Sequence, residues 1–338
     1  MKKKFKKILV TGGAGCIGIQ VCKELAKKKI FVVLFDLKER IKLVRNEINS
    51  DYIETFNGSI MNMMDLKKAS INCDAIIHLA AYLGVNRTEK NKLKCLDINI
   101  AGTRNIIDLI GSSKKIKKII FASSSEVYGE PLKNPVNENS ITQGKTVYAI
   151  SKLAGEELVK SICEIKKVHF TIIRYFNTYG PYQVKQFVIS KFIDLIKKNK
   201  NPIINGNGKQ LRSYNYSKDS AKATVDCLLS DKLENKIINI GNDKSKINLI
   251  NLVKLINKIL KKNIKKKLNL KFKKTDRSYN REINVRYCDI NLAKKKLGYR
   301  AKYSLEMGIR EMIKISKNPS DWVLEDKPNS DSFYDLNE

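Results

Sequence analysis

A glycine-rich turn between a strand pattern and a helix pattern constrains this chain more than any other feature. The apolar run KKILVT precedes Gly13-Ala14-Gly15-Cys16-Ile17-Gly18, which has the spacing G-x-G-x-x-G, and an amphipathic helical pattern continues to about residue 29. A second apolar run, IFVVLFD, ends at Asp36. A strand, a glycine turn, a helix and an acidic strand end, in this order, predict a dinucleotide-binding βαβ unit.

The chemistry of this turn indicates which dinucleotide fits. Glycines let the backbone approach a diphosphate at the helix N-terminus, where amide groups and the helix dipole favour an anion. Asp36 can accept hydrogen bonds from the adenosine ribose and would repel a 2′-phosphate, so we expect NAD rather than NADP. The simpler alternative is a glycine-rich turn that only packs the helix against the strand.

The rest of the chain continues to alternate strand and helix patterns. Four more β-branched runs, DYIETFNG, CDAIIHLAA, KKIIFASSS and VHFTIIRYFN, are separated mostly by helical stretches, near 61–70, 91–112 and 147–167. Near-continuous apolar strands alternating with helices predict a parallel sheet covered on both faces, a Rossmann-type doubly wound α/β fold. We expect an NAD-binding domain at 1–176 with a returning strand near 236–241, a smaller C-terminal substrate-binding lobe at 177–318, and an acidic tail at 319–338.

The formal net charge of +32 raises the question of an anionic partner. A nucleic acid or a membrane surface is one interpretation. The other is a composition rich in Lys, Ile and Asn over the whole chain, with the lysines on the polar faces of predicted helices. Because no aromatic residues interleave the lysine runs, as stacking on bases would require, we favour the second interpretation and expect no nucleic-acid partner.

Other features of the composition narrow the cellular setting. The seven cysteines are scattered and never form C-x-x-C, which is typical of reduced thiols in the cytoplasm. We see no apolar run of signal-peptide length before the first strand and none of membrane-spanning length, so we expect a cytoplasmic protein without membrane insertion. With only two histidines, His78 and His169, we expect no metal site.

Several further motifs carry a family resemblance. They are TGGAGCIG, HLAA at 78–81, NIAGTRN at 99–105, SSSEVYG at 123–129, YAISK at 148–152 and RYFNTYGP at 174–181, joined by RSYNYSKD at 212–219 and REINVRYCDI at 281–290. In this order they resemble the extended short-chain dehydrogenase/reductase group, the nucleotide-sugar epimerase/dehydratase family, over residues 6 to 315. The resemblance implies NAD as cofactor, a nucleotide-diphosphate sugar as substrate, and a homodimer formed through the helices near 91–112 and 147–167.

The same resemblance assigns residues to the cofactor site. The implied contacts are Gly12, Gly15, Cys16, Ile17, Gly18, Asp36, Ser59, Ile60, Leu79, Ala80, Ala81, Asn99, Tyr148 and Lys152. Two positions depart from the family pattern. Cys16 stands where an aromatic residue is usual, and Ser59 stands where an aspartate usually holds the adenine amino group. We expect Ser59 to hydrogen-bond more weakly, which would loosen the hold on the adenine.

Tyr148 and Lys152 are four residues apart in a helical pattern, which puts both side chains on one face. A free tyrosine has a pKa of about 10 and is a poor base at neutral pH. The ammonium of Lys152, with the positive nicotinamide ring, would favour the phenolate and lower that pKa. Tyr148 would then remove a proton from a sugar hydroxyl that Ser124 orients, and the resemblance implies that Lys152 also holds the nicotinamide ribose. In isolation, the same pair could belong to an ordinary solvated helix face.

The resemblance also assigns the substrate side of the site. Asn177 follows a strand end and would hold a substrate phosphate. Arg212 and Arg286 would grip the nucleotide diphosphate, since a forked guanidinium can bind phosphate oxygens in pairs. Their alternative role is surface charge. Ser124 and Ser125 would contact the sugar.

The residue pattern around Glu126 does not decide which reaction the chain catalyses. Ser125-Glu126 matches a pair found in GDP-sugar dehydratases and UDP-glucuronate decarboxylases of the family, but SSSEVYG also occurs in epimerases, and Glu126 could simply face solvent. We interpret the chain as an NAD-dependent nucleotide-sugar 4-epimerase acting through a 4-keto sugar, because that reaction needs no second base. UDP-glucuronate decarboxylase and nucleotide-sugar 4,6-dehydratase are the alternatives, with Glu126 as a catalytic residue. The intact Ser124, Tyr148 and Lys152 argue against a non-enzymatic regulator that binds NAD or nucleic acid.

Overall fold

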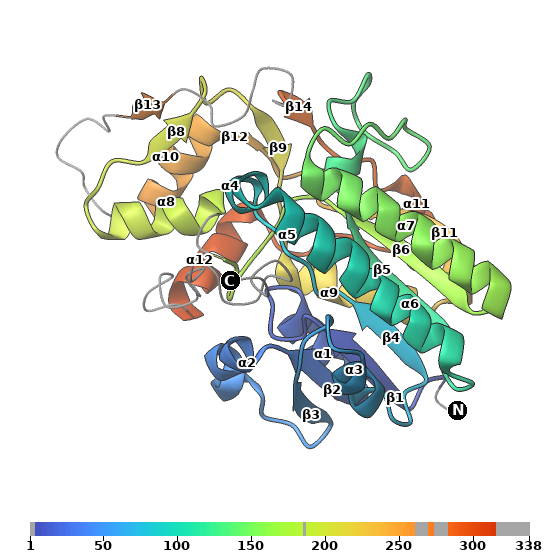
Figure 1. Cartoon of the computed structure of the whole chain (residues 1–338). Coiled ribbons are helices and arrows are strands. Elements are labelled where there is room, and N and C mark those ends of the chain that lie inside the picture. The colour runs from blue at the N-terminus through green and yellow to red at the C-terminus, as the bar shows by residue number, and fades with distance from the viewer. Residues whose placement is uncertain (1–3, 185–186, 261–269, 274–282, 316–338) are drawn as a thin grey trace, which may run out of the picture.

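The computed structural model of the chain describes residues 4–184, 187–260, 270–273 and 283–315. Its centre is a seven-stranded parallel sheet in the order β11-β6-β5-β4-β1-β2-β3 (Figure 1). The strands are β1 (Lys7–Thr11), β2 (Phe31–Asp36), β3 (Ile53–Asn57), β4 (Ala75–His78), β5 (Lys118–Ser124), β6 (His169–Tyr175) and β11 (Lys236–Ile240). The strand order reverses beside β1, as in the doubly wound Rossmann arrangement, and this confirms the predicted fold class.

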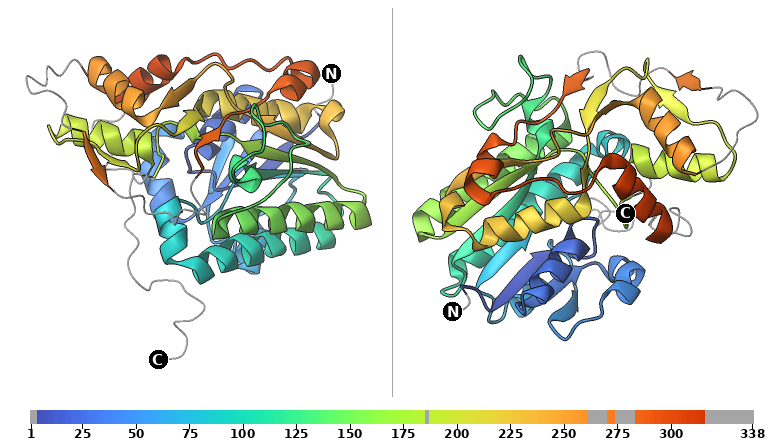
Figure 2. Two further views of the ribbon diagram at one scale, coloured as in Figure 1. Left: turned by 90° about the horizontal axis from the view of Figure 1, so that it is seen from above. Right: turned by 180° about the vertical axis from the view of Figure 1, so that it is seen from behind.

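Two apolar layers cover the sheet, one on each face. Neighbouring residues of a strand point to opposite faces, so Ile8 of β1 joins one core while Leu9 joins the other. The first face carries α1 (Gly18–Lys27) and α9 (Ser217–Leu229), and the second carries α3 (Met63–Ala69), α6 (Gly102–Ser112) and α7 (Val147–Lys166). Figure 2 shows the two helical layers from two further sides. Burial on both faces is the reason why the strands read as continuous apolar runs.

A second group of elements forms a lobe beside the sheet. Its helices are α8 (Val188–Lys197), α10 (Leu249–Ile259) and α12 (Leu305–Ile315), and its small sheets are β12 (Lys246–Asn248) with β9 (Leu211–Ser213) and β14 (Val285–Arg286), β8 (Ile203–Asn205) with β13 (Lys271–Lys273), and β7 (Thr178–Tyr179) with β10 (Asn215–Tyr216). The returning strand predicted near 236–241 corresponds to β11, which pairs with β6 of the central sheet. The helix α9, within the segment predicted as the lobe, also packs on the central domain, against α1. The domain boundary at residue 176 stays a prediction.

Shorter elements complete the described chain. They are α2 (Lys38–Val44), α4 (Val85–Lys90), α5 (Lys92–Leu96), α11 (Asn291–Leu297), the 3-10 turns η1 (Arg45–Glu47), η3 (Ser125–Tyr128) and η4 (Asp231–Leu233), and the π-helical turn η2 (Asp97–Ala101). Within the described ranges, none of the helices combines the length and the apolar character needed to cross a membrane. The predicted acidic tail at 319–338 lies outside the described residues.

Candidate active site

A cavity of about 520 Å³ opens between the carboxyl ends of the central strands and the lobe. The glycine turn after β1 lines one part of it, together with Leu79 and Ala81 after β4. The end of β5 and the start of α7 line a second part, and α8, β8 and β9 of the lobe line a third. A cleft at the carboxyl ends of parallel strands is where α/β sheets of this kind bind their ligands.

The glycine turn forms a cradle that larger side chains would fill. Gly12 has a φ of +69°, and a Cβ there would lie 2.6 Å from the amide nitrogen of Ala80. A Cβ on Gly18 would lie 2.1 Å from the carbonyl oxygen of Gly12. Gly12, Gly15, Cys16, Ile17 and Gly18 all line the cavity at the N-terminus of α1. The turn therefore fits the diphosphate of a dinucleotide, whose oxygens would face backbone amides.

Asp36 stabilises the glycine turn through hydrogen bonds to backbone amides. Its Oδ2 accepts the amide N–H of Ala14 at 2.9 Å, and its Oδ1 accepts that of Leu37 at 2.8 Å. Burial raises the pKa of Asp36, and the nearby guanidinium of Arg40 opposes this shift. Arg40 lines the cavity and donates to the carbonyl oxygens of Tyr182 (3.0 Å) and Ala14 (3.5 Å). The ribose contact of Asp36 stays a prediction, and Arg40 adds a cation to the same end of the site.

The residues expected around the adenine and along β4 have specific partners. The hydroxyl of Ser59 accepts the N–H of Met61 at 3.2 Å within its own turn, and the carbonyl of Ile60 accepts Asn105 Nδ2 at 2.9 Å. Neither residue is among those that line the cavity, whereas Leu79 and Ala81 are. Ala80 supports the site through its backbone, which abuts Gly12.

Asn99 has a different position from the one expected. Its side-chain amide is buried, accepts the N–H of Tyr82 at 2.7 Å, and donates to the carbonyl of Tyr82 at 3.0 Å and to the hydroxyl of Ser151 at 2.9 Å. It does not line the cavity. Asn99 therefore ties the chain after β4 to α7, and its contribution to a cofactor would pass through that chain. Direct contact with a cofactor stays a prediction.

Ser124, Tyr148 and Lys152 meet at the middle of the cavity. Thr146 caps α7 by accepting the N–H of Ala149 at 3.1 Å, which fixes the start of the helix that carries Tyr148 and Lys152. The hydroxyl of Ser124 hydrogen-bonds to Tyr148. Lys152 Nζ lies 5.8 Å from the centre of the Tyr148 ring. The structure therefore brings these three side chains together, and their roles in catalysis stay predictions.

Burial shifts the pKa of both Tyr148 and Lys152 in the direction that favours the neutral form. Burial raises the pKa of Tyr148, the charge of Glu126 raises it further, and the hydrogen bond from Ser124 opposes the shift. Burial also lowers the pKa of Lys152 to about 8, against the nearby charge of Glu156. Desolvation disfavours both charged forms, and the lower Tyr148 pKa expected from the ammonium together with the nicotinamide ring stays a prediction.

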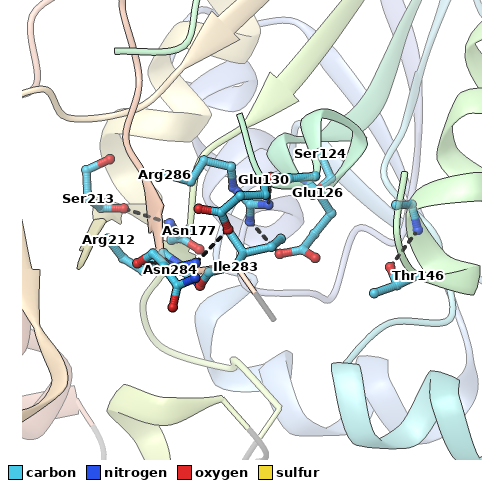
Figure 3. A network of polar contacts seen from close by, with 12 residues as sticks. Ser124, Glu126, Glu130, Thr146, Asn177, Arg212, Ser213, Ile283, Asn284 and Arg286 are labelled. Atoms are coloured by element: carbon cyan, nitrogen blue, oxygen red, sulfur yellow. Dashed lines mark hydrogen bonds and ion pairs between the residues drawn. The ribbon is translucent and has the colours of Figure 1, made fainter. Parts of the chain in front are cut away.

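Glu126 is paired with Arg286 in a contact that joins the end of β5 to β14 (Figure 3). Arg286 Nη2 donates to Glu126 Oε1, and Nη1 donates to the carbonyl of Gly129 at 3.4 Å. The side chain of Arg286 is 1% exposed and that of Glu126 is 18% exposed. Glu126 lines the cavity and Arg286 does not. The expectation that Glu126 could simply face solvent is therefore wrong, because a buried guanidinium requires a charged partner.

The remaining substrate-side residues surround this pair. Arg212 lines the cavity and lies opposite Arg286 in the β9–β14 register. Its guanidinium donates to the carbonyl oxygens of Leu211 (2.9 Å), Asn284 (3.0 Å) and Ile283. Asn177 also lines the cavity, where its Nδ2 donates to the carbonyl of Ser213 at 3.0 Å (Figure 3). Ser125 is buried at the cavity wall.

These positions divide the expected diphosphate ligands into two classes. Arg212 and Asn177 reach the cavity directly. Arg286 does not line the cavity. Its Nη2 donates to Glu126, and among the described residues its buried Nε has no hydrogen-bond partner. The diphosphate roles of all three residues stay predictions.

The matching family model is described as GDP-mannose 4,6 dehydratase, and it matches residues 9–312. The chain belongs to this family. The predicted membership in the nucleotide-sugar epimerase/dehydratase family is thereby confirmed. A putative UDP-glucose 4-epimerase of Methanocaldococcus jannaschii is 33% identical over 320 residues, which cover 92% of this chain and 98% of that protein. A UDP-N-acetyl-alpha-D-glucosaminuronate decarboxylase of Bacillus cytotoxicus is 31% identical and covers 91% of this chain and 97% of that protein.

Solved structures agree with this family membership. The crystal structure of a UDP-glucuronic acid 4-epimerase from Bacillus cereus, in complex with UDP-glucuronic acid and NAD, superposes with a TM-score of 0.83 at 28% identity. The match covers 91% of this chain and 98% of the epimerase. Epimerases and a decarboxylase of the family thus have similar sequence identities to this chain.

Several residues that line the cavity were not predicted from the sequence. Arg40, Thr146, Tyr179 and Gln183 line it, as do Lys191 of α8 and Asn205 of β8. Arg40 could have been found from its place four residues after Asp36, since that spacing puts it in the first helix after the acidic strand end. The lobe residues follow irregular turns and very short strands, so no periodicity marks which of their side chains face inward.

Proposed function

We propose that the chain is an NAD-dependent nucleotide-sugar 4-epimerase that works through transient oxidation at C4 of the sugar. The observation that carries this proposal is the meeting, in one cavity, of the glycine cradle with Ser124, Tyr148 and Lys152. The chain is an enzyme of the epimerase/dehydratase family, and NAD is its cofactor, as in the Bacillus cereus epimerase structures that contain NAD. Gly12, Gly15 and Gly18 would hold the NAD diphosphate, and Lys152 would hold the nicotinamide ribose.

The chain's own residues would manage the proton. Bound NAD supplies the hydride acceptor and donor at the sugar carbon. Tyr148 takes the proton from the C4 hydroxyl as a general base, and Ser124 hydrogen-bonds that hydroxyl and fixes its direction. Burial and Glu126 both raise the pKa of Tyr148, so the phenolate needs positive charge close by. Lys152 is the cation that the same helix face provides.

The polar residues at the lobe side of the cavity support one class of substrate. Arg212 and Asn177 at the cavity wall would bind the diphosphate of a nucleotide sugar and leave its sugar beside Tyr148. The putative UDP-glucose 4-epimerase of Methanocaldococcus jannaschii and the UDP-glucuronic acid 4-epimerase of Bacillus cereus support a nucleotide-diphosphate sugar as substrate. An epimerase needs no further acid or base beyond the residues around C4.

A second candidate is favoured by one observation. Glu126 and Arg286 place a carboxylate and a guanidinium beside the end of the site where Tyr148 lies, and Glu126 acts on the pKa of Tyr148. This ion pair could act on sugar atoms beyond C4, as the reactions of a decarboxylase or a 4,6-dehydratase require. The decarboxylase from Bacillus cytotoxicus supports this candidate at nearly the same identity as the epimerase relative.

Product mass separates the two candidates. Purified protein would be incubated with UDP-glucose, UDP-N-acetylglucosamine, UDP-glucuronate and the matching GDP-sugars, and the products would be weighed by mass spectrometry. We expect a product of unchanged mass and a new 4-epimer by NMR. Loss of water would indicate a dehydratase, and loss of carbon dioxide would indicate a decarboxylase. Either loss would overturn the epimerase proposal.

A further inference from the structure

His78 ends β4, immediately before Leu79, which lines the cofactor side of the cavity. The side chain of His78 is buried and does not line the cavity. Both of its ring nitrogens have partners on other elements. Nδ1 lies 2.7 Å from Thr11 Oγ of β1, and Nε2 lies 3.2 Å from Thr103 Oγ of α6. One buried imidazole therefore joins β1, β4 and α6.

The partners of the ring decide where its proton lies. Burial and the nearby charge of Lys152 lower the pKa of His78 to about 3, so the ring is neutral at neutral pH. Thr103 Oγ donates to the carbonyl oxygen of Asn99 at 2.6 Å, which uses the only proton of that hydroxyl. Thr103 therefore accepts from His78, and this puts the imidazole proton on Nε2. Nδ1 is then an acceptor, and the hydroxyl of Thr11 donates to it.

At the cofactor end, these hydrogen bonds reach the backbone that follows β4. Because the hydroxyl of Thr11 gives its proton to His78, its oxygen is left to accept, and the N–H of Ala80 points to it at 3.5 Å. The carbonyl oxygen of Thr11 accepts the N–H of Leu79 at 3.0 Å. The backbone of Ala80 in turn abuts Gly12 of the cradle. Thr11 and His78 thus help to hold the chain that walls the glycine turn.

At the other end, the hydrogen bonds reach α7. Asn99 donates through Nδ2 to Ser151 Oγ at 2.9 Å, and Ser151 donates to the carbonyl oxygen of Tyr148 at 2.8 Å. A buried polar network whose members all have partners rigidifies the elements that it joins. We call this network the His78 network, and it consists of five buried side chains, those of Thr11, His78, Thr103, Asn99 and Ser151.

We propose that His78 is a positioning residue that, as a neutral imidazole with its proton on Nε2, ties the wall of the cofactor cradle to the helix that carries Tyr148 and Lys152. It does not line the cavity, so it acts through Thr11 and Thr103. Hydride transfer requires cofactor and substrate at one relative position, and small displacements of the groups that hold them lower the rate. Only the turnover measurement below rests on the proposed function.

The position of the proton can be measured in the whole protein. The chain has two histidines, so nitrogen-15 NMR gives two sets of ring signals, and His169→Asn assigns them. We expect His78 to be the Nε2–H tautomer and to show no titration between about pH 5 and 8. A proton on Nδ1, or a ring that titrates in this range, would overturn the inference.

Two substitutions of Thr103 test the coupling. Thr103→Val keeps the shape of the side chain and removes the hydroxyl, whereas Thr103→Ser keeps the hydroxyl and removes a methyl group. We expect Thr103→Val to raise the Kd of NAD⁺ for the cofactor-free protein about three- to tenfold, the effect of one neutral hydrogen bond, and to lower kcat by at least as much. Thr103→Ser should keep both values close to those of the wild type.

Thr171→Val is the matched control. Thr171 is buried on β6, and its hydroxyl donates to the carbonyl oxygen of Leu233 at 2.8 Å, outside the His78 network. This variant loses a buried hydroxyl of the same kind, so it should lose stability without weakening NAD⁺ binding. Calorimetry would measure the Kd, and thermal unfolding would measure the stability of each variant.

The other outcomes contradict the inference. Unchanged NAD⁺ affinity and kcat in Thr103→Val, or a loss in only one of them, would show that the network does not couple the two parts of the site. A loss in Thr103→Ser or Thr171→Val as large as in Thr103→Val would reduce Thr103 to a packing role. If Thr103→Val did not fold, Thr11→Val would replace it. If the wild type turned over no nucleotide sugar, the proposed function would fail, and the NMR and NAD⁺ measurements would still decide the role of His78.

Discussion

Tyr148 takes its chemical state from residues that lie far from it in the sequence. Ser124 and Glu126 come from the end of β5, and both act on the phenol at the start of α7. The hydrogen bond from Ser124 favours the phenolate, whereas the charge of Glu126 and the burial of the ring oppose it. A base with these neighbours is held in its neutral form until a positive charge is brought close to it.

Removing the hydroxyl of Tyr148 tests its assignment as the base. Tyr148→Phe keeps the ring in its packing, so the melting temperature should stay near that of the wild type. We expect kcat with an accepted nucleotide sugar to fall about 10²- to 10⁴-fold, which is the usual contribution of proton-transfer catalysis. Steady-state kinetics would measure this loss. Turnover close to the wild-type rate would show that another group removes the proton.

Neutralising Glu126 should change the pH dependence of the reaction. In the proposed mechanism Tyr148 acts as a base in its deprotonated form, so activity should rise with pH through its pKa. Because the charge of Glu126 raises the pKa of Tyr148, Glu126→Gln should lower that pKa and move the acidic limb of kcat/KM to lower pH. Glu130→Gln is the matched control, since that carboxylate accepts the backbone N–H groups of Asn284 and Val285.

The same variant separates the two candidate reactions by rate. In an epimerase, Glu126→Gln should leave the pH-independent kcat within about tenfold of the wild type, because Glu126 touches no proton that moves at C4. In a decarboxylase or dehydratase the loss should reach the 10² or more expected for a catalytic acid or base. If the acidic limb of kcat/KM in Glu126→Gln stayed at the same pH as in the wild type, the electrostatic coupling between Glu126 and Tyr148 would be refuted.

Some of these residue roles could be predicted from the sequence and others could not. The spacing of Tyr148 and Lys152 is local, so a helical pattern was enough to bring them together. Glu126 and Arg286 are 160 residues apart, and no periodicity connects them. The sequence therefore suggested two separate roles for residues that the structure joins in one ion pair. Burial, which depends on the complete fold, is the largest effect on the pKa of Tyr148, and no local pattern in the sequence predicts it.

At the scale of elements, α7 is held against the sheet by a buried ionic contact. Glu156 accepts two hydrogen bonds from Arg174 of β6, at 2.7 and 2.9 Å, and one from the hydroxyl of Ser123 at 2.5 Å. Both charged side chains are almost completely buried. Ser123 immediately precedes Ser124, and Glu156 follows Lys152 by one helical turn. This contact therefore ties together the two elements that carry the proposed catalytic residues.

Glu156→Gln should destabilise the protein strongly. The change leaves the buried guanidinium of Arg174 without a compensating charge, and breaking a buried pair in this way costs about 3 kcal/mol or more. Denaturation with urea would measure the free energy of unfolding. The control is Glu157→Gln, whose exposed carboxylate pairs with Lys160 one turn away. That variant should change stability by no more than about 0.5 kcal/mol. Equal effects of the two substitutions would contradict the anchoring role of Glu156.

The elements also differ in how far the sequence predicts them. The strands of the central sheet have long apolar runs that are buried on both faces, so their positions could be read from the sequence. The strands β9, β12 and β14 have two or three residues each and exist only because distant segments pair, as Arg212 does with Arg286. The helix α9 has a clear pattern, but nothing local indicates that it packs on α1 and not in the lobe.

At the scale of the whole molecule, the formal net charge is +32. Two arginines, Arg40 and Arg212, and two lysines, Lys152 and Lys191, line the candidate active-site cavity. A positive field of this kind raises the rate at which anionic nucleotides reach a site. The charge thus has a use within the proposed reaction, and the absence of a nucleic-acid partner stays a prediction.

The outer face formed by α5, α6 and α7 carries the predicted dimer contact. The helices α6 and α7 pack side by side on one face of the sheet (Figure 2). On this layer Ile150 and Ile165 of α7 are 52% and 72% exposed, and Leu93 of α5 is 58% exposed. Apolar side chains exposed on neighbouring helices become stable when a second copy covers them, since burial of apolar surface contributes about 25 cal/mol per Å². We therefore propose that two copies associate through these helices.

Introducing charge on this face should separate the two copies. Ile150→Glu and Ile165→Glu would each require a charged group to be buried at the contact, which is unfavourable without a partner. We expect sedimentation velocity at micromolar concentration and moderate salt to show a dimer for the wild type and mainly a monomer for the double variant, with a Kd raised about 100-fold or more. Met64→Glu is the control, because Met64 is 68% exposed on a different helix, α3, and its substitution should leave the dimer unchanged.

A wild-type monomer under these conditions would refute the dimer, and a double variant that stays dimeric would place the contact on another face. NAD binding by the monomeric variant would show in addition that the cradle of Gly12, Gly15 and Gly18 is complete within one chain, as its position between β1 and α1 implies.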